Sequence, residues 1–264
     1  MPHDICISDL CTIGADFEKN LQQFIAAGFE NVELMMDGPV WSGFASKRHD
    51  LISMMKRYPI NYTLHGPGFE TNLASDNETI RHACLETYLD AISFAACAGC
   101  PTLLVHPGFC QIPGADKNRV IQRSKELLAA LCKCAKESGV RLVVENVGFN
   151  GTSIYTYNEF IHLLDGFGDE AGYVIDIGHA LLNGWDCASL IRDTSKRLYG
   201  IHLHDNNSIS DQHLPIGQGN ALWDDIFREI SALSHSVNLI LEYDYGTPLS
   251  EFSESRKILI KSIK

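Results

Sequence analysis

Residues 171–205 read AGYVIDIGHALLNGWDCASLIRDTSKRLYGIHLHD, and this stretch decides the expected fold. Two short apolar runs, the first ending at Asp176 and the second containing His202, flank a segment at 190–197 with the apolar spacing of a helix. Each run carries a polar side chain close to its carboxyl end. A strand, a helix and a second strand are therefore predicted here, with chemically active side chains where the strands end.

The same alternation of an apolar run and a helical run fills the rest of the chain. Helical spacing recurs at 17–27, 80–98, 118–138 and 223–233. Eight strand candidates centre near Cys6, Glu33, Leu64, Leu104, Val144, Ile175, Ile201 and Leu241. Eight such units in about 250 residues match a closed (β/α)8 barrel. A doubly wound open sheet shows the same alternation, but the chain lacks a dinucleotide fingerprint, so we predict an α/β fold with a single TIM-barrel domain over residues 1–264.

Composition and charge exclude several classes of protein. The 264 residues are 45% hydrophobic and 20% charged, which is typical of a globular chain rather than a disordered one. The net charge of −12 is opposite in sign to that of most proteins that coat nucleic acid or bind anionic membranes. No apolar stretch approaches the ~18 residues of a membrane span, and the first residues lack the pattern of a signal peptide. We expect a cytoplasmic protein that does not associate with membranes.

The nine cysteines are scattered along the chain, and several lie inside apolar runs. This usage favours buried thiols in a reducing compartment over a disulfide framework. Cys97 and Cys100 form the one C-x-x-C motif, but no strand precedes them and no second pair follows. We therefore expect inert thiols rather than a redox or zinc site.

Six consecutive strand candidates end in a His, an Asp or a Glu. These residues are His65, His106, Glu145, Asp176, His202 and Glu242. Successive side chains of a strand point to opposite faces, and these polar residues have apolar neighbours. If the apolar neighbours pack against outer helices, the polar side chains point into the mouth of the barrel, where TIM-barrel enzymes carry their active sites.

Three of these residues, Glu145, Asp176 and Glu242, would bring three negative charges together, and His202 could offset only one of them. Unpaired buried charges are costly, and mutual hydrogen bonding is the simplest remedy for any single residue. For the whole set, a divalent cation removes the repulsion directly. One imidazole with three carboxylates suits Mn²⁺, Mg²⁺ or Zn²⁺. Further candidates for the same face are Glu33, His179, Asp211 and His213.

At these positions the chain resembles the xylose isomerase-like TIM-barrel superfamily, which contains sugar isomerases and epimerases, inosose-processing enzymes and abasic-site nucleases of the endonuclease IV class. The resemblance is carried by E-N at 145–146, D-x-G-H at 176–179, H-x-x-D at 202–205 and L-E at 241–242. It implies a single-metal tetrad of Glu145, Asp176, His202 and Glu242. The trinuclear zinc set of the nucleases would add His65, His106, His179, Asp211 and His213.

Two observations argue against the nuclease alternative. Residues 65–72 lack the tyrosine of the nuclease pattern, and after the seventh strand His204 and Asn207 stand where the nucleases have Asn and Lys. The loop 66–79 is acidic and contains neither Lys nor Arg. Binding duplex DNA needs such basic side chains along the surface. Nucleic acid is therefore not the expected partner.

The sequence thus predicts a metal-dependent isomerase or epimerase that acts on a small, non-phosphorylated carbohydrate. One divalent ion would stabilise the enediolate formed on proton removal, with Glu145 and Glu242 as base and acid. Glu33, Trp41 and Phe69 are expected to line the substrate pocket. The alternative is a zinc-dependent endonuclease for abasic DNA with up to three zinc ions, and a third interpretation is a sugar-binding barrel without turnover. A homo-oligomeric state is compatible with the sequence.

Overall fold

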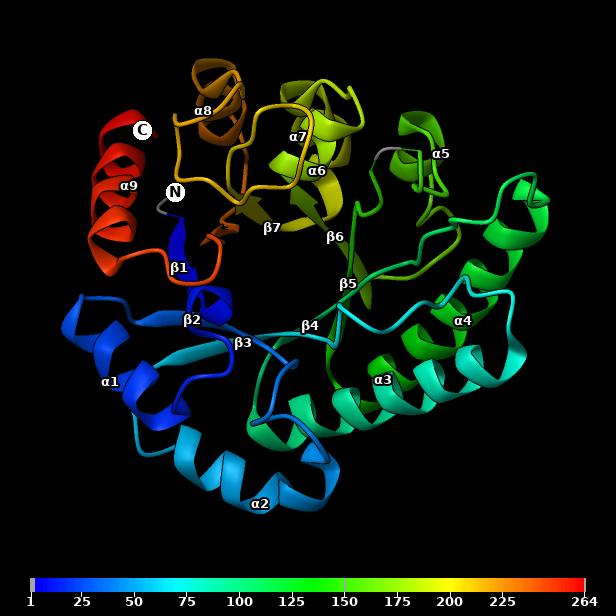
Figure 1. Ribbon diagram of the computed structural model, residues 1–264, viewed down its shortest axis with the longest axis horizontal. Coiled ribbons are helices and arrows are strands. Elements are labelled where there is room, and N and C mark those ends of the chain that lie inside the picture. Colours follow the sequence, from blue (N-terminus) through cyan, green and yellow to red (C-terminus); the bar gives the residue numbers. More distant parts are fainter. Residues whose placement is uncertain (1–2, 150, 264) are drawn as a thin grey trace.

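The computed structural model describes residues 3–149 and 151–263, and its strands close into one parallel barrel in the order of the sequence. Figure 1 shows the barrel with the helices arranged around it. The strands are β1 (Asp4–Ser8), β2 (Asn31–Met35), β3 (Asn61–His65), β4 (Thr102–Val105), β5 (Arg141–Glu145), β6 (Ala171–Asp176), β7 (Leu198–Leu203) and β8 (Asn238–Leu241). The predicted closed barrel is confirmed, because β1 pairs with both β2 and β8.

Helices follow the strands and cover the outside of the barrel. They are α1 (Phe17–Ala26), α2 (Phe44–Met55), α3 (Glu78–Ala98), α4 (Lys117–Ser138), α5 (Tyr157–Ile161), α6 (Ile177–Leu182), α7 (Cys187–Thr194), α8 (Trp223–Ser231) and α9 (Leu249–Ser262), with 3-10 turns η1 (Asp9–Thr12) and η2 (Ser195–Arg197). Side chains cap several helix starts by accepting a backbone N–H, as Asp16 does for α1 and Asn77 for α3. The short helix α6 begins directly at the end of β6, and Asp176 is its cap.

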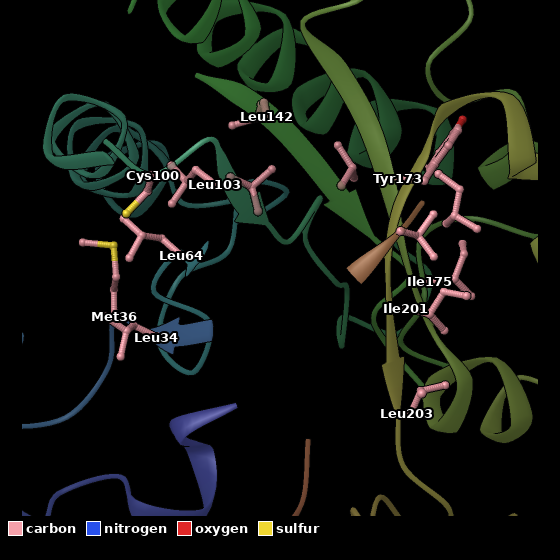
Figure 2. Close-up of a cluster of buried hydrophobic side chains, with 14 of the residues drawn as sticks. Leu34, Met36, Leu64, Cys100, Leu103, Leu142, Tyr173, Ile175, Ile201 and Leu203 are labelled. Carbon is pink, nitrogen blue, oxygen red and sulfur yellow. The ribbon is translucent and has the colours of Figure 1, made fainter. Parts of the chain in front are cut away.

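The apolar side chains of β4, β5 and β6 divide between two clusters, one outside and one inside the barrel. One face packs against the helices, and Figure 2 shows Ile175, Ile201 and Leu203 among the side chains of this outer layer. The alternate residues Val143 and Val174 belong to a small separate cluster. Glu145 and Asp176 stand two residues after these two valines, so they share the inner face. The strand alternation therefore directs the polar ends of β5 and β6 into the barrel.

All nine cysteines are free thiols, which agrees with the expected lack of a disulfide framework. Cys97 is exposed and Cys100 is buried, and burial raises the pKa of Cys100 to about 12. At neutral pH this thiol stays protonated, so it is a poor nucleophile. Within 3–149 and 151–263, no helix combines the length and the apolar character needed to cross a membrane.

Candidate metal centre

The carboxyl ends of β3 to β8 bring six side chains of types that can bind metals to one end of the barrel. His65, Glu145 and Asp176 are the last residues of β3, β5 and β6, and His202 is the penultimate residue of β7. His106 follows β4 directly, and Glu242 follows β8 in the same way. His106 is partly buried, and the other five are buried.

Glu145, Asp176, His202 and Glu242 form what we call the central cluster, in which one ligand atom from each residue lies within 4.8 Å of the others. The Nδ1 atom of His202 lies 3.0 Å from Glu145 Oε1, 3.2 Å from Glu242 Oε2 and 3.7 Å from Asp176 Oδ2. Its other ring nitrogen, Nε2, is 2.8 Å from Glu33 Oε1. The buried Glu33 carboxylate thus fixes the orientation of the His202 ring, so that Nδ1 faces the three acidic side chains.

Unpartnered atoms at this site fit a bound cation. Among the described residues, the buried atoms that lack a hydrogen bond include His202 Nδ1 and Glu242 Oε1 of the central cluster, together with Asp211 Oδ1 nearby. Leaving such atoms unsatisfied costs about 1–3 kcal/mol each, and more when they are charged. A divalent cation would bind these lone pairs and would offset the repulsion among the carboxylates. One nitrogen and three carboxylates suit Zn²⁺, Mn²⁺ or Mg²⁺.

The surrounding charges keep these acids ionised. Burial alone would raise the pKa of Glu145, but the charge of His202 and the hydrogen bond from His106 hold it well below its usual range. Burial would also raise the pKa of Glu242, but the charge of His202 and its contact with Glu242 lower this pKa to about 2. Conversely, Glu242, Glu33 and Glu145 overcome burial and raise the pKa of His202 well above 6.5. Without a metal, the His202 ring therefore carries an additional proton, and a cation would displace it.

A second group, the β3–β4 cluster, consists of His65, His106 and Glu145. Glu145 Oε2 lies 2.8 Å from His106 Nε2 and 3.6 Å from His65 Nε2. Its other oxygen, Oε1, is the one that faces His202. Glu145 is therefore shared by two potential cation positions, one through each carboxylate oxygen.

A third group, which we call the loop cluster, contains His179, Asp211 and His213, and His204 lies within ligand distance of the same group. The Nε2 atoms of both histidines lie 3.2 Å from Asp211 Oδ2. Their Nδ1 atoms lie 3.1 Å from backbone carbonyls, that of Asn146 for His179 and that of Glu242 for His213. If Nδ1 donates to the carbonyl, the Nε2 lone pair of each ring is left free toward Asp211, which is the arrangement of a metal-binding histidine. The backbone of His213 adopts a positive φ of 44°, which is uncommon for a residue with a side chain.

Asp205, whose role the sequence did not reveal, holds the loop that carries Asp211 and His213. The Asp205 side chain is fully buried and accepts four hydrogen bonds. The donors are the backbone N–H groups of Asn206, Gly217 and Ala221 and the indole N–H of Trp223. A Cβ at Gly219 would overlap Asp205 Oδ1 and the backbone of Asn206, so the loop needs glycine there. The H-x-x-D motif at 202–205 contained this residue, but spacing alone could not assign its partners.

A cavity of about 530 Å³ opens above the clusters. Its polar floor comprises His65, His106, Glu145, His179, Asp211, His213 and Glu242, and its apolar walls include Leu10, Met35, Phe69, Phe109, Val147 and Phe149. The described residues that line it include neither Lys nor Arg. Of the three residues predicted for the substrate pocket, Phe69 lies in this wall, and Glu33 lies behind His202. Trp41 is buried beside a neighbouring cavity of about 980 Å³.

Comparison with known proteins identifies the family of this barrel. A family model described as a xylose isomerase-like TIM barrel matches residues 21–262. The chain belongs to the xylose isomerase-like TIM-barrel family. The motifs at the ends of β5 to β8 therefore carried the correct resemblance, and the predicted fold family is confirmed.

Proteins similar to this xylose isomerase-like barrel differ in the activities that their names give. A solved D-tagatose 3-epimerase-like protein matches with a TM-score of 0.85 at 21% identity, covering 98% of this chain and 96% of that chain. A zinc-bound structure of the IOLI protein matches with a TM-score of 0.82 at 15% identity, covering 98% and 97%. In sequence, a probable endonuclease 4 from Campylobacter concisus is 26% identical over 209 residues, which are 67% of this chain and 71% of that protein. The structural likenesses establish a shared fold, and the ligand clusters support a divalent metal.

Proposed function

We propose that the chain is a divalent-metal-dependent isomerase or epimerase of a small, non-phosphorylated carbohydrate. The observation that carries this proposal is the pair Glu145 and Glu242, whose carboxylates lie 3.0 and 3.2 Å from the same His202 nitrogen at the floor of the cavity. The two acids come from strands that are not neighbours in the sheet, so they approach a bound molecule from different directions. The fold shared with an epimerase-like protein supports the same conclusion.

Glu145, Asp176, His202 and Glu242 would hold the cation. When bound, it supplies Lewis-acid polarisation of a substrate carbonyl and stabilises the negative charge that develops on proton loss. Glu145 and Glu242 are held ionised, so one of them accepts the proton from a substrate carbon. The other takes a proton from water and delivers it to the opposite face, and the first acid then releases its proton to solvent. His106 lines the cavity, and its Nε2 atom lies 2.8 Å from Glu145 Oε2, so it orients that carboxylate beside the substrate.

The charge of the cavity supports an uncharged substrate. Phosphate recognition commonly uses Arg or Lys, and the described lining residues contain neither. The neighbouring cavity is lined by Asp37, Glu70 and Asp90, which would repel a phosphate group at that side. A neutral carbohydrate avoids this repulsion.

A zinc-dependent phosphodiesterase for abasic DNA is the second candidate, and a specific observation favours it. Besides the central cluster, the β3–β4 cluster and the loop cluster are both assembled, so the protein offers ligands for up to three zinc ions. Sequence similarity to a probable endonuclease 4 points the same way. The described residues of the cavity lining include neither Lys nor Arg, which weighs against a polyanionic substrate such as DNA.

Hydrogen exchange and metal analysis test the proposal together. A panel of ketoses in heavy water should show deuterium uptake at carbon with the wild-type protein, and Glu145→Gln and Glu242→Gln should each reduce it by at least about 10²-fold. Glu137→Gln, at an exposed position of α4, is the charge-matched control and should leave exchange unchanged. Retained exchange in both site variants would remove these acids from the chemistry. Cleavage of an abasic duplex with three bound zinc ions, without exchange on any ketose, would select the second candidate.

A further inference from the structure

His204 lies immediately after β7 and touches two of the three clusters. Its side chain is fully buried, and its Nε2 atom lies 3.0 and 2.9 Å from Asp176 Oδ1 and Oδ2. Its ring stacks on His213 with centroids 3.8 Å apart and planes inclined by 7°. It also meets the ring of His179 edge to face, at 5.9 Å. One side chain therefore contacts an acid of the central cluster and both histidines of the loop cluster.

The stacked geometry excludes His204 and His213 as joint ligands of one ion. An imidazole binds a metal in the plane of its ring, at about 2.0–2.1 Å from nitrogen for zinc. Two nearly parallel rings 3.8 Å apart direct their lone pairs along nearly parallel lines, which do not converge on one point. At most one of the two stacked rings is therefore a ligand of an ion in this group of four residues. The Nε2 atom of His204 is already held by Asp176, whereas that of His213 faces Asp211, so we assign His213 as the ligand and His204 as its support.

Hydrogen bonds show what this support fixes. Asp176 Oδ1 accepts the backbone N–H of His179 at 2.6 Å, and His204 donates to the same carboxylate through Nε2. Both oxygens of Asp176 are thereby oriented, with Oδ2 toward His202. The flat face of His204 meanwhile sets the plane of the His213 ring.

Gly178 provides the space that this arrangement needs. A Cβ at Gly178 would overlap the imidazole ring of His204, and the nearest atoms are all ring atoms of that histidine. Gly178 does not have a left-handed φ, so alanine would meet a steric obstacle there without backbone strain. The glycine of the D-x-G-H motif is thus explained by the side chain of a residue 26 positions later.

We propose that His204 is a positioning residue that orients Asp176 and His213 together, so that cation binding at the central cluster and at the loop cluster depends on one side chain. This inference rests on the metal centre of the proposed function. Because the two clusters share a support, loss of His204 should weaken zinc binding at both, although His204 is a ligand at neither. The expected loss is about 10–100-fold in zinc affinity, as for other residues that orient metal ligands.

Zinc titration of four variants tests the proposal. Metal-free protein is titrated with Zn²⁺ against a chromophoric chelator, and elemental analysis counts the ions retained after dialysis. His204→Ala should raise the zinc Kd by about 10–100-fold. His204→Asn keeps a side-chain N–H for Asp176, and His204→Phe keeps a ring against His213, so each should recover part of the loss at one cluster. His82→Asn, at an exposed position of α3, is the control.

Gly178→Ala provides a test that leaves His204 in the sequence. It should weaken zinc binding as His204→Ala does, and the double variant should be no weaker than His204→Ala alone, because the overlap no longer exists. The melting temperature of each metal-free variant separates lost folding from lost metal affinity.

Unchanged zinc affinity in both His204→Ala and His204→Phe would overturn the inference, and so would additive losses in the double variant. A wild-type protein that binds no zinc would overturn the proposed metal centre as well. Wild-type binding with unaffected variants would overturn only the role of His204.

Discussion

Replacing Glu33 is expected to weaken the metal centre without removing a ligand. Glu33 lies on β2, is 2% exposed and accepts a hydrogen bond from His202 Nε2 at 2.8 Å. This bond fixes the proton on Nε2, so that the Nδ1 lone pair faces Glu145, Asp176 and Glu242. Without it, a neutral His202 is free to carry its proton on Nδ1, where it would block the cation.

The size of the effect follows from what each substitution removes. Glu33→Ala deletes both the charge and the acceptor, and we expect the zinc Kd to rise by about 10–100-fold, or about 1.4–2.7 kcal/mol. Glu33→Gln keeps an acceptor oxygen for His202 but loses the negative charge. Charge-assisted hydrogen bonds are about twice as strong as neutral ones, so the glutamine variant should lose less affinity than the alanine variant.

Competition with a chromophoric chelator measures both constants on protein stripped of metal. Glu30→Gln, exposed just before β2, is the matched control and should bind zinc as the wild type does. The metal-free melting temperature reports whether folding is retained. A zinc Kd for Glu33→Ala within twofold of the wild-type value, in a folded protein, would refute the assigned role of Glu33.

Three further outcomes are expected. Burial raises the pKa of Asp9 from 3.8 to about 7. Between about pH 4 and 7 the folded state therefore binds a proton that the unfolded state has lost. In this range the carboxyl lowers the free energy of unfolding by about 1.4 kcal/mol for each unit that the pH rises. Asp9→Asn should remove that slope in urea unfolding measured across this range, and an unchanged slope would contradict the assignment. Asp205→Asn presents an amide N–H₂ to N–H groups such as that of Trp223, and it should cost about 1–3 kcal/mol in urea unfolding; a change below 0.5 kcal/mol would count against Asp205 as the loop anchor. Zinc at about 100 times its Kd should stabilise the protein by about 2.7 kcal/mol, seen as a higher melting temperature than in excess chelator, and equal melting temperatures would argue against any metal centre.

The sequence was most informative where a feature depends on alternation along one strand. Glu145 and Asp176 could be assigned to the inner face because their apolar neighbours claim the outer one. Adjacent parallel strands then bring such residues together, since their carboxyl ends meet at one end of the barrel. The central cluster and the closed barrel were therefore accessible from spacing, and the family motifs added the order of the ligands.

Features that depend on contacts between distant segments were not accessible in this way. Glu33 was expected to face inward, but alternation gives only a face, and its contact with His202 joins strands that are not paired. Trp41 was assigned to the pocket from its loop position; it lines the neighbouring cavity, and its ring packs against Phe17 and Phe94. The fit of His204 beside Gly178 depends on ring orientation, which no pattern of residue types encodes.

Glu145 connects the number of bound ions to the reaction the site can perform. Its Oε1 faces the central cluster and its Oε2 faces the β3–β4 cluster. With cations at both positions, both oxygens would be bound to metal, and the two positive charges would make this carboxylate a weaker proton acceptor. Proton abstraction by Glu145 is therefore favoured when the β3–β4 cluster is free of metal, with His106 as the partner of Oε2. With both positions occupied, Glu145 would serve as a ligand of two ions, and a two-metal site would supply the activation of water for hydrolysis. Stripping the β3–β4 position selectively, through His65→Ala, should for this reason leave an isomerase active and inactivate a phosphodiesterase.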